Sequence, residues 1–172
     1  NVNSYKLPEK WSGYIGYTYE APSKNDTAKK KLKKKPKKVS SKNGYTLVIH
    51  NLNTGEEDKI PYVTSYTFAK EAEILSYVTT GIKDSINAGV YVIDLKKWDS
   101  KHIFHSHDKT KYYKLTLSDS GDNLAFIIDS DTSKSYHRNN ELYIWDKTVD
   151  KASIIANTKI SPEGYRVSSD GM

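Results

Sequence analysis

Short runs of mostly apolar residues, about four to eight long, are separated by polar turns along most of this chain. This is the pattern of half-buried β-strands rather than of amphipathic helices. Tyr14–Glu20 and Tyr45–His50 are two such runs. After the second run, Asn53–Glu56 predicts a turn in which Gly55 is free to adopt a positive φ.

Two segments fit the strand pattern less well. Lys59–Val63 predicts a short strand whose Pro61 would be tolerated only at a sheet edge, because proline has no N–H to donate. Ala69–Leu75 consists of good helix formers. Its alignment with Ser118–Asp122 in a repeat of the chain instead predicts a hairpin turn, and we follow the repeat.

That repeat is the strongest signal in the sequence. Tyr66–Val78 aligns with Leu115–Ile127 at an offset of 49 residues. Gly89–Leu95 aligns with Glu141–Lys147 at an offset of 52, through a shared apolar-Tyr-apolar-apolar-Asp core. Val167–Gly171 starts a further copy. A period of about fifty residues filled with short strands is typical of propeller blades.

We therefore predict an all-β fold, a partial β-propeller of antiparallel four-stranded blades. Two complete blades are expected at about 62–107 and 112–158, preceded by a three-stranded partial blade and followed by a lone strand at Tyr165–Ser168. A closed ring takes about four to eight blades. The chain, which begins with Asn1 rather than Met, is therefore expected to be a fragment of a longer protein.

The domain organisation follows from composition. Residues 1–11 are predicted to be an irregular N-terminal segment and 12–172 the partial propeller, interrupted by a disordered Lys-rich insertion at 21–44. Residues 24–42 hold ten Lys and one Asp, so the net charge of this segment, +9, exceeds the net charge of +6 of the whole chain. The remainder is therefore mildly acidic, and the basic character belongs to one segment.

The Lys-rich segment could neutralise nucleic-acid phosphates. Specific readout needs Arg and aromatic residues among the Lys, and this segment has neither. We therefore predict a solvated loop and no specific nucleic-acid partner. The chain has no run of 18 apolar residues, so no membrane span is expected, and it has no Cys, which excludes disulfides and thiol chemistry.

Leu117-Ser-Asp-Ser-Gly-Asp-Asn-Leu-Ala-Phe126, followed by Leu142-Tyr-Ile-Trp-Asp146, resembles the propeller of prolyl oligopeptidase-type serine peptidases, especially the exported bacterial members. Asn51–Glu56 with Val63–Phe68 is similar to a blade junction of that group. The resemblance covers about residues 12–172. Non-catalytic TolB-like propellers share the Ser-x-x-Gly-x-x-Leu-Ala-Phe unit, so a protein-interaction propeller is the alternative reading.

The resemblance implies a propeller that gates peptide access to a C-terminal α/β-hydrolase domain carrying a Ser-His-Asp triad. It also implies peptide substrates and a periplasmic or otherwise extracytoplasmic location. The triad needs a Gly-x-Ser-x-Gly elbow, and this chain contains none. We therefore predict no catalytic residue and no cofactor in this chain, and we expect any peptidase activity to belong to the parent protein.

Family members that are aminopeptidases hold the substrate amino terminus with paired glutamates. The only adjacent pair here, Glu56 and Glu57, follows a turn and lacks the helical context, so that role is not transferred. Binding residues stay unassigned.

Three further groups of residues could carry chemistry. His102, His105 and His107 with Asp108 could ligate zinc or copper, and Asp119, Asp129 and Asp131 are carboxylates in turns. At the histidines we predict no metal, but an outer strand that runs into an exposed turn. The aspartates could suggest acid/base catalysis or calcium binding, but they are predicted to form turns and strand ends. Trp98, Trp145 and the Tyr-rich strands could form a sugar-stacking platform, but aromatic residues alternating in strands predict packing between blades. Trp11 is expected to pack in the same way beside the first strand.

Overall fold

Eleven β-strands and no helix make up the part of the chain that the computed structural model describes, residues 2–19, 44–81, 85–106, 110–131, 133 and 138–169. The strands are β1 (Val2–Lys6), β2 (Tyr14–Tyr19), β3 (Tyr45–Asn51), β4 (Glu57–Phe68), β5 (Ile74–Thr79), β6 (Gly89–Asp94), β7 (Asp99–His105), β8 (Lys111–Leu117), β9 (Asn123–Asp129), β10 (Asn140–Asp146) and β11 (Ser153–Ala156). Each strand pairs antiparallel with its neighbour in sequence, except that no pairing joins β7 to β8.

Strand β4 belongs to two blades in succession. Its first half pairs with β3, with Ile60 opposite Leu47, and its second half pairs with β5, with Phe68 opposite Leu75. The two halves meet at Tyr62, which has a positive φ of 59°. The seven hydrogen-bonded strands β1–β7 are thus two four-stranded blades that share one long strand.

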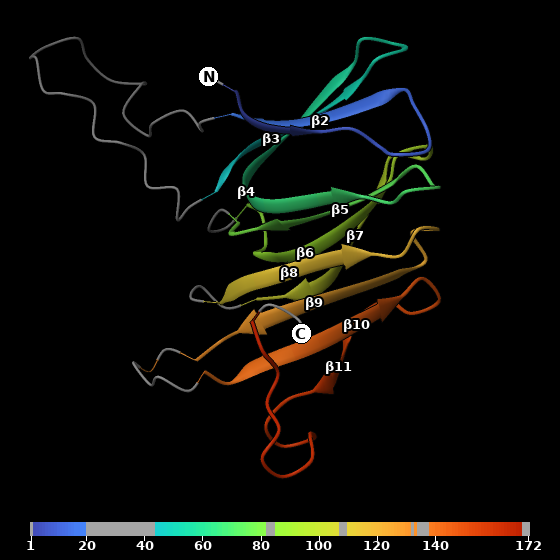
Figure 1. Cartoon of the computed structure of the whole chain (residues 1–172). Coiled ribbons are helices and arrows are strands. Elements are labelled where there is room, and N and C mark those ends of the chain that lie inside the picture. Colours follow the sequence, from blue (N-terminus) through green and yellow to red (C-terminus); the bar gives the residue numbers. More distant parts are fainter. Residues whose placement is uncertain are drawn as a thin grey trace, which may run out of the picture.

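The chain therefore forms three blades side by side (Figure 1). Blade 1 is β1, β2, β3 and the first half of β4; blade 2 is the second half of β4 with β5, β6 and β7; blade 3 is β8 to β11. The all-β, partial-propeller prediction is confirmed. The count differs in detail, because β1 supplies the strand that the first partial blade was expected to lack.

Residues 2–6, expected to be irregular, form that strand. Val2 pairs with Tyr19 and Lys6 with Gly16. All five residues of β1 are exposed, so no apolar pattern marks the strand in the sequence. The Lys6 ammonium donates to the Tyr66 carbonyl at 2.6 Å, which ties the strand to blade 2.

The predicted lone strand at Tyr165–Ser168 does not form. This segment is irregular, and Val167 is held by a 2.9 Å hydrogen bond from the Asn140 side chain rather than by a strand ladder. The predicted Lys-rich insertion at 21–44 lies outside the described residues except for Gly44. That glycine is buried, and a Cβ there would lie 2.5 Å from the Tyr62 carbonyl oxygen.

Both hairpin predictions are confirmed. Ala69–Leu75 contains a reversal in which the Ala69 N–H donates to the Ile74 carbonyl at 2.9 Å. The chain also reverses at Gly121, whose φ is 75°. Gly55 likewise has a φ of 77° in the turn predicted for it.

Two apolar cores fill the spaces between the blades. The first, between blades 1 and 2, buries Leu47, Ile49, Ile60, Val63, Tyr66, Leu75, Tyr77, Ile93 and Leu95. The second, between blades 2 and 3, buries Val78, Val90, Val92, Ile103, Leu124, Phe126, Ile128 and Trp145. Alternating strand positions therefore point into the seams, as the repeat predicts.

The turns after the first strand of each blade, which we call the A–B turns, also join the blades. The Trp11 indole N–H of blade 1 donates to the Ala69 carbonyl of blade 2 at 3.0 Å. The Glu71 N–H of blade 2 donates to the Asp119 carbonyl of blade 3 at 2.8 Å. Lys10 and Glu71 form an ion pair at 2.5 Å. Successive blades are thus linked along one face of the molecule.

Candidate functional site

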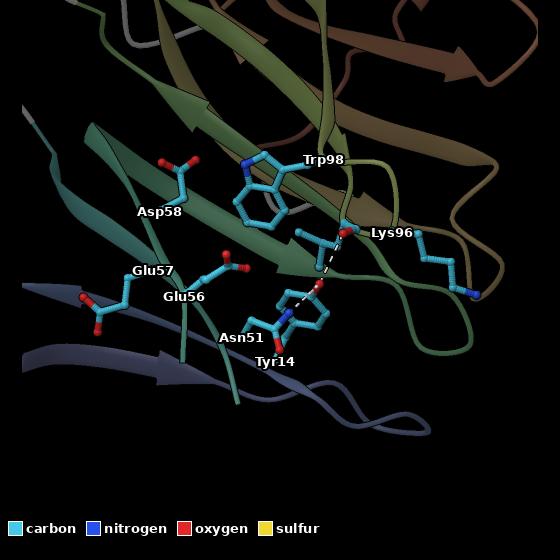
Figure 2. Close-up of a pocket in the computed structure, with 8 residues that line it drawn as sticks. Tyr14, Asn51, Glu56, Glu57, Asp58, Lys96 and Trp98 are labelled. Carbon is cyan, nitrogen blue, oxygen red and sulfur yellow. Dashed lines mark hydrogen bonds between the residues drawn. The ribbon is translucent and has the colours of Figure 1, made fainter. Parts of the chain in front are cut away.

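A pocket of about 580 Å³ opens at the seam between blades 1 and 2 (Figure 2). It lies where β2 begins, β3 ends and β4 begins on one side, and at the β6–β7 turn on the other. We call it the seam pocket; it is lined by Tyr14, Asn51, Glu56, Glu57, Asp58, Leu95, Lys96 and Trp98. Its size is within the range of small-ligand sites.

Tyr14 forms one wall of the seam pocket and is hydrogen-bonded to both blades. Its hydroxyl donates to the Leu95 carbonyl of blade 2 at 3.2 Å and accepts a hydrogen bond from the Asn51 amide at 3.2 Å. Burial raises the pKa of Tyr14, and the negative charges of Glu73 and Glu56 raise it further. The Tyr14 phenol therefore stays a neutral, oriented ring in a negative surrounding.

Trp98 forms the opposite wall. The turn before it is held by the Asp94 carboxylate, which accepts from the N–H groups of Lys96 and Lys97 at 3.0 and 3.2 Å. Trp98 itself has a φ of 54°, which is rare for a bulky residue. Its indole lies nearly parallel to the Tyr14 ring, with centroids 6.5 Å apart and an interplanar angle of 19°.

The prediction that Trp98 packs as core between blades is wrong, because its side chain is 47% exposed. Because Trp98 lies in the β6–β7 turn and not in a strand, its indole lies over the opening of the seam pocket. The other two tryptophans do pack as predicted. Trp145 is buried between blades 2 and 3, and Trp11 packs against the first core.

The three acidic residues at the start of β4 separate by strand alternation. Figure 2 shows the carboxylates of Glu56 and Asp58 on the side of Trp98, while Glu57 points away. Glu57 accepts hydrogen bonds from the Tyr17 hydroxyl at 3.0 Å and from His50 Nδ1 at 3.1 Å. These contacts, the Tyr17 bond first, lower the pKa of Glu57.

Glu56 and Glu57 therefore do not act as a pair. All three acidic residues line the pocket, but the carboxylates of Glu56 and Asp58 lie on the side of Trp98 and that of Glu57 does not.

The histidine cluster is a packing feature of β7. The His102 ring stacks on Tyr91, with centroids 4.3 Å apart, and its edge meets His105 at 5.7 Å. Burial lowers the pKa of His102. His107 and Asp108 lie outside the described residues. Among the residues the structure describes, no three His, Cys, Asp or Glu side chains come close enough to hold a metal ion.

The aspartates lie in turns and at a strand end, as predicted, but Asp129 has a further role. Its carboxylate is fully buried at the end of β9 and accepts from Arg138 Nε at 2.8 Å and Nη2 at 2.6 Å. The Tyr113 hydroxyl donates to the same carboxylate at 3.3 Å. This ion pair closes the base of the β9–β10 loop, and Asp131 accepts the Ser133 N–H beside it.

Sequence reasoning missed the seam pocket. Its residues come from three separate stretches of the chain, and only the register of the blades brings them together. One signal was available: in the aligned repeat, Trp98 falls opposite Asp150. An aromatic residue at a turn position that is polar in the other copy points to an exposed ring.

Within the described ranges, no helix is long and apolar enough to cross a membrane. The predicted Lys-rich loop lies outside those ranges, so the structure does not bear on its contacts.

Three antiparallel four-stranded blades packed face to face define a β-propeller fold, and solved structures share it. The β-propeller domain of the Trilobed protease from Pyrococcus furiosus, described as having an open velcro topology, is 15% identical with a TM-score of 0.54, covering 89% of this chain and 41% of that one. The tricorn protease is 11% identical with a TM-score of 0.53, covering 89% and 13%. Pyrococcus horikoshii acylaminoacyl peptidase is 13% identical with a TM-score of 0.54, covering 89% and 24%.

All three neighbours are peptidases, and this chain spans less than half the length of each. At these identities the similarity establishes the fold. No protein-family model and no curated protein matches the sequence.

Proposed function

We propose that this chain is the non-catalytic propeller portion of a serine peptidase of the prolyl oligopeptidase type. In this proposal the propeller screens the peptides that reach a Ser-His-Asp triad on a C-terminal α/β-hydrolase domain of the parent protein. The observation that carries it is the three-bladed array itself, which matches the propellers of peptidases over 89% of its length.

The residues of the family resemblance occupy positions on which the fold depends. Gly121 turns the β8–β9 hairpin with a positive φ, and Leu124 and Phe126 are fully buried in the second core. The matching segments are thus blade-building elements. They support a propeller of this type and leave the chemistry to the hydrolase domain.

Screening requires that the blades stay together, so that a polypeptide cannot pass between them. The seams meet this requirement, because each has a continuous apolar core and hydrogen bonds between the A–B turns. Separating two blades would expose a whole apolar core to water, at a free-energy cost of about 25 cal/mol for each Å² of apolar surface. A substrate would therefore be selected by size at the rim of the rigid array.

The first experiment reads the parent reading frame and labels its product with a fluorophosphonate. We expect a Gly-x-Ser-x-Gly motif, then Asp, then His, after the propeller, and labelling that is lost when the motif serine is replaced by alanine. A frame with further blades and without that set would refute the peptidase assignment. It would favour the non-catalytic TolB-like module.

The second experiment tests screening in the full-length enzyme. Cleavage rates of one recognition sequence embedded in peptides of increasing length, and in a folded protein, should fall steeply with size. Trp11→Ala, which removes the seam hydrogen bond to Ala69, should relax the size limit, and Tyr5→Ala at an exposed position should not. Equal rates for short peptides and folded protein would refute screening.

An extracytoplasmic location is part of the same proposal, since it accompanies the exported members of the family. Cell fractionation with an antibody against the chain tests it. Recovery with cytoplasmic markers alone would contradict this part without affecting the fold assignment.

A further inference from the structure

We propose that the seam pocket binds an arginine side chain of a peptide or protein ligand, with the guanidinium stacked against Trp98 and hydrogen-bonded to the carboxylates of Glu56 and Asp58. This binding does not depend on the peptidase assignment. It follows from the charge, the rings and the rigidity of the pocket.

The charge of the pocket is incompletely neutralised. Glu57 has a lysine partner at 3.4 Å, and Lys96 on the rim is paired with Glu73 at 3.5 Å. Within the described part of the chain, neither Glu56 nor Asp58 forms an ion pair. Glu56 accepts only the Thr54 hydroxyl at 3.0 Å, and Asp58 only the Lys59 N–H at 2.9 Å. Both carboxylates therefore keep acceptor capacity for a cation.

The aromatic walls select the shape of that cation. Trp offers the most favourable ring face for a cation, and the indole of Trp98 is about half exposed. Tyr14 lies nearly parallel to it across the pocket, so the cavity is bounded by flat faces. A guanidinium is planar, stacks on aromatic faces and carries donors in a rigid fork that fits carboxylates, whereas an ammonium is a compact point charge.

The walls are also fixed before a ligand arrives. Tyr14 is held by two hydrogen bonds, one to each blade, and the Trp98 turn is held by the Asp94 carboxylate. Little ordering is therefore required on binding, which favours measurable affinity for a single side chain.

The test is isothermal titration calorimetry of the chain at low salt with three capped amino acids, N-acetyl-arginine amide, N-acetyl-lysine amide and N-acetyl-citrulline amide. Citrulline has the shape of arginine without its charge. We expect saturable binding of the arginine compound, binding of the lysine compound at least about threefold weaker, and binding of the citrulline compound at least about tenfold weaker. Quenching of tryptophan fluorescence should follow the same order.

Variants locate the site. Glu56→Gln combined with Asp58→Asn should weaken arginine binding at least about tenfold, because both charge-assisted hydrogen bonds are lost. Trp98→Asn, which suits the positive φ but removes the ring, should weaken it severalfold, and Trp98→Tyr should retain most of it. Glu163→Gln is the matched control and should change the Kd by less than about twofold, since Glu163 is exposed and does not line the pocket.

Three results would overturn the proposal. Equal affinity for arginine and citrulline would remove the role of charge, and equal affinity for arginine and lysine would remove the role of the planar fork. A loss with Glu163→Gln as large as that with the double variant would place the binding elsewhere.

Discussion

Gly121→Ala tests whether the seam between blades 2 and 3 is packed as tightly as the structure indicates. Gly121 has a φ of 75°, and an added Cβ would lie 2.8 Å from Ile74 Cγ1 and 3.3 Å from Ala69 Cβ. Two costs therefore add: about 1–2 kcal/mol for the left-handed backbone and about 1–3 kcal/mol for overpacking. We expect the free energy of unfolding to fall by about 2–5 kcal/mol.

Gly55→Ala is the matched control. Gly55 has nearly the same φ, 77°, but nothing lies within 4 Å of its added Cβ. It should therefore lose only the backbone part, about 1–2 kcal/mol. Urea unfolding of both variants, followed by tryptophan fluorescence with the slope m compared, separates the two contributions. If both glycines lose equal stability, the close approach of the blade 3 turn to Ile74 is wrong.

Three further predictions concern single side chains. Tyr66→Phe removes the buried 3.0 Å hydrogen bond to the Gly16 carbonyl and should cost about 1 kcal/mol in urea unfolding; an equal loss for Tyr5→Phe, at an exposed ring, would contradict this. Asp129→Asn should destabilise the chain several times more than Asp150→Asn, because Asp129 is fully buried against Arg138 and Asp150 is 91% exposed; equal melting temperatures would refute it. Because burial lowers the pKa of His102 below its ordinary 6.5, its contribution to stability is complete above pH 6.5 and declines as the pH falls through the lowered value. His102→Gln should therefore lessen the loss of stability on acidification from pH 7.5 to 5.5, and an unchanged pH profile would show that His102 does not titrate in this range.

The blades that the sequence predicts are those whose central strands, such as β5 and β9, are buried on both faces. Blades 2 and 3 follow from the repeat because Leu75 and Leu124 fill equivalent places in the two seams, and each is fully buried. The Ala69–Leu75 segment shows why the repeat outweighs helix propensity. Propensities differ by less than about 1 kcal/mol per residue, whereas Ala69 and Leu75 are both buried against neighbouring blades.

The parts that could not be predicted depend on partners distant in sequence. Strand β1 is exposed at every residue, and only its pairing with β2 defines it. Conversely, Val167–Ser169 repeats residues at the end of an earlier strand, but no strand forms there, because a strand needs a partner for its backbone hydrogen bonds. The seam pocket is another such case, since Tyr14 and Trp98 are 84 positions apart.

Pro61 shows how one local feature of the sequence determines the geometry of the site. It was expected at an edge, and it lies in a bulge of β4, where one residue of β3, Thr46, faces two of β4, Pro61 and Tyr62. No ladder N–H is lost there, while its carbonyl accepts the Thr79 hydroxyl at 3.1 Å and the next carbonyl, of Tyr62, accepts the Thr80 N–H at 3.0 Å. Sliding β4 along β5 would break both bonds, which hold β4 to blade 2, while the pairing of Ile60 with Leu47 holds the same strand to blade 1. The carboxylates at the start of β4 and the indole on the β6–β7 turn are therefore held at a constant separation, as a site that selects one planar cation requires.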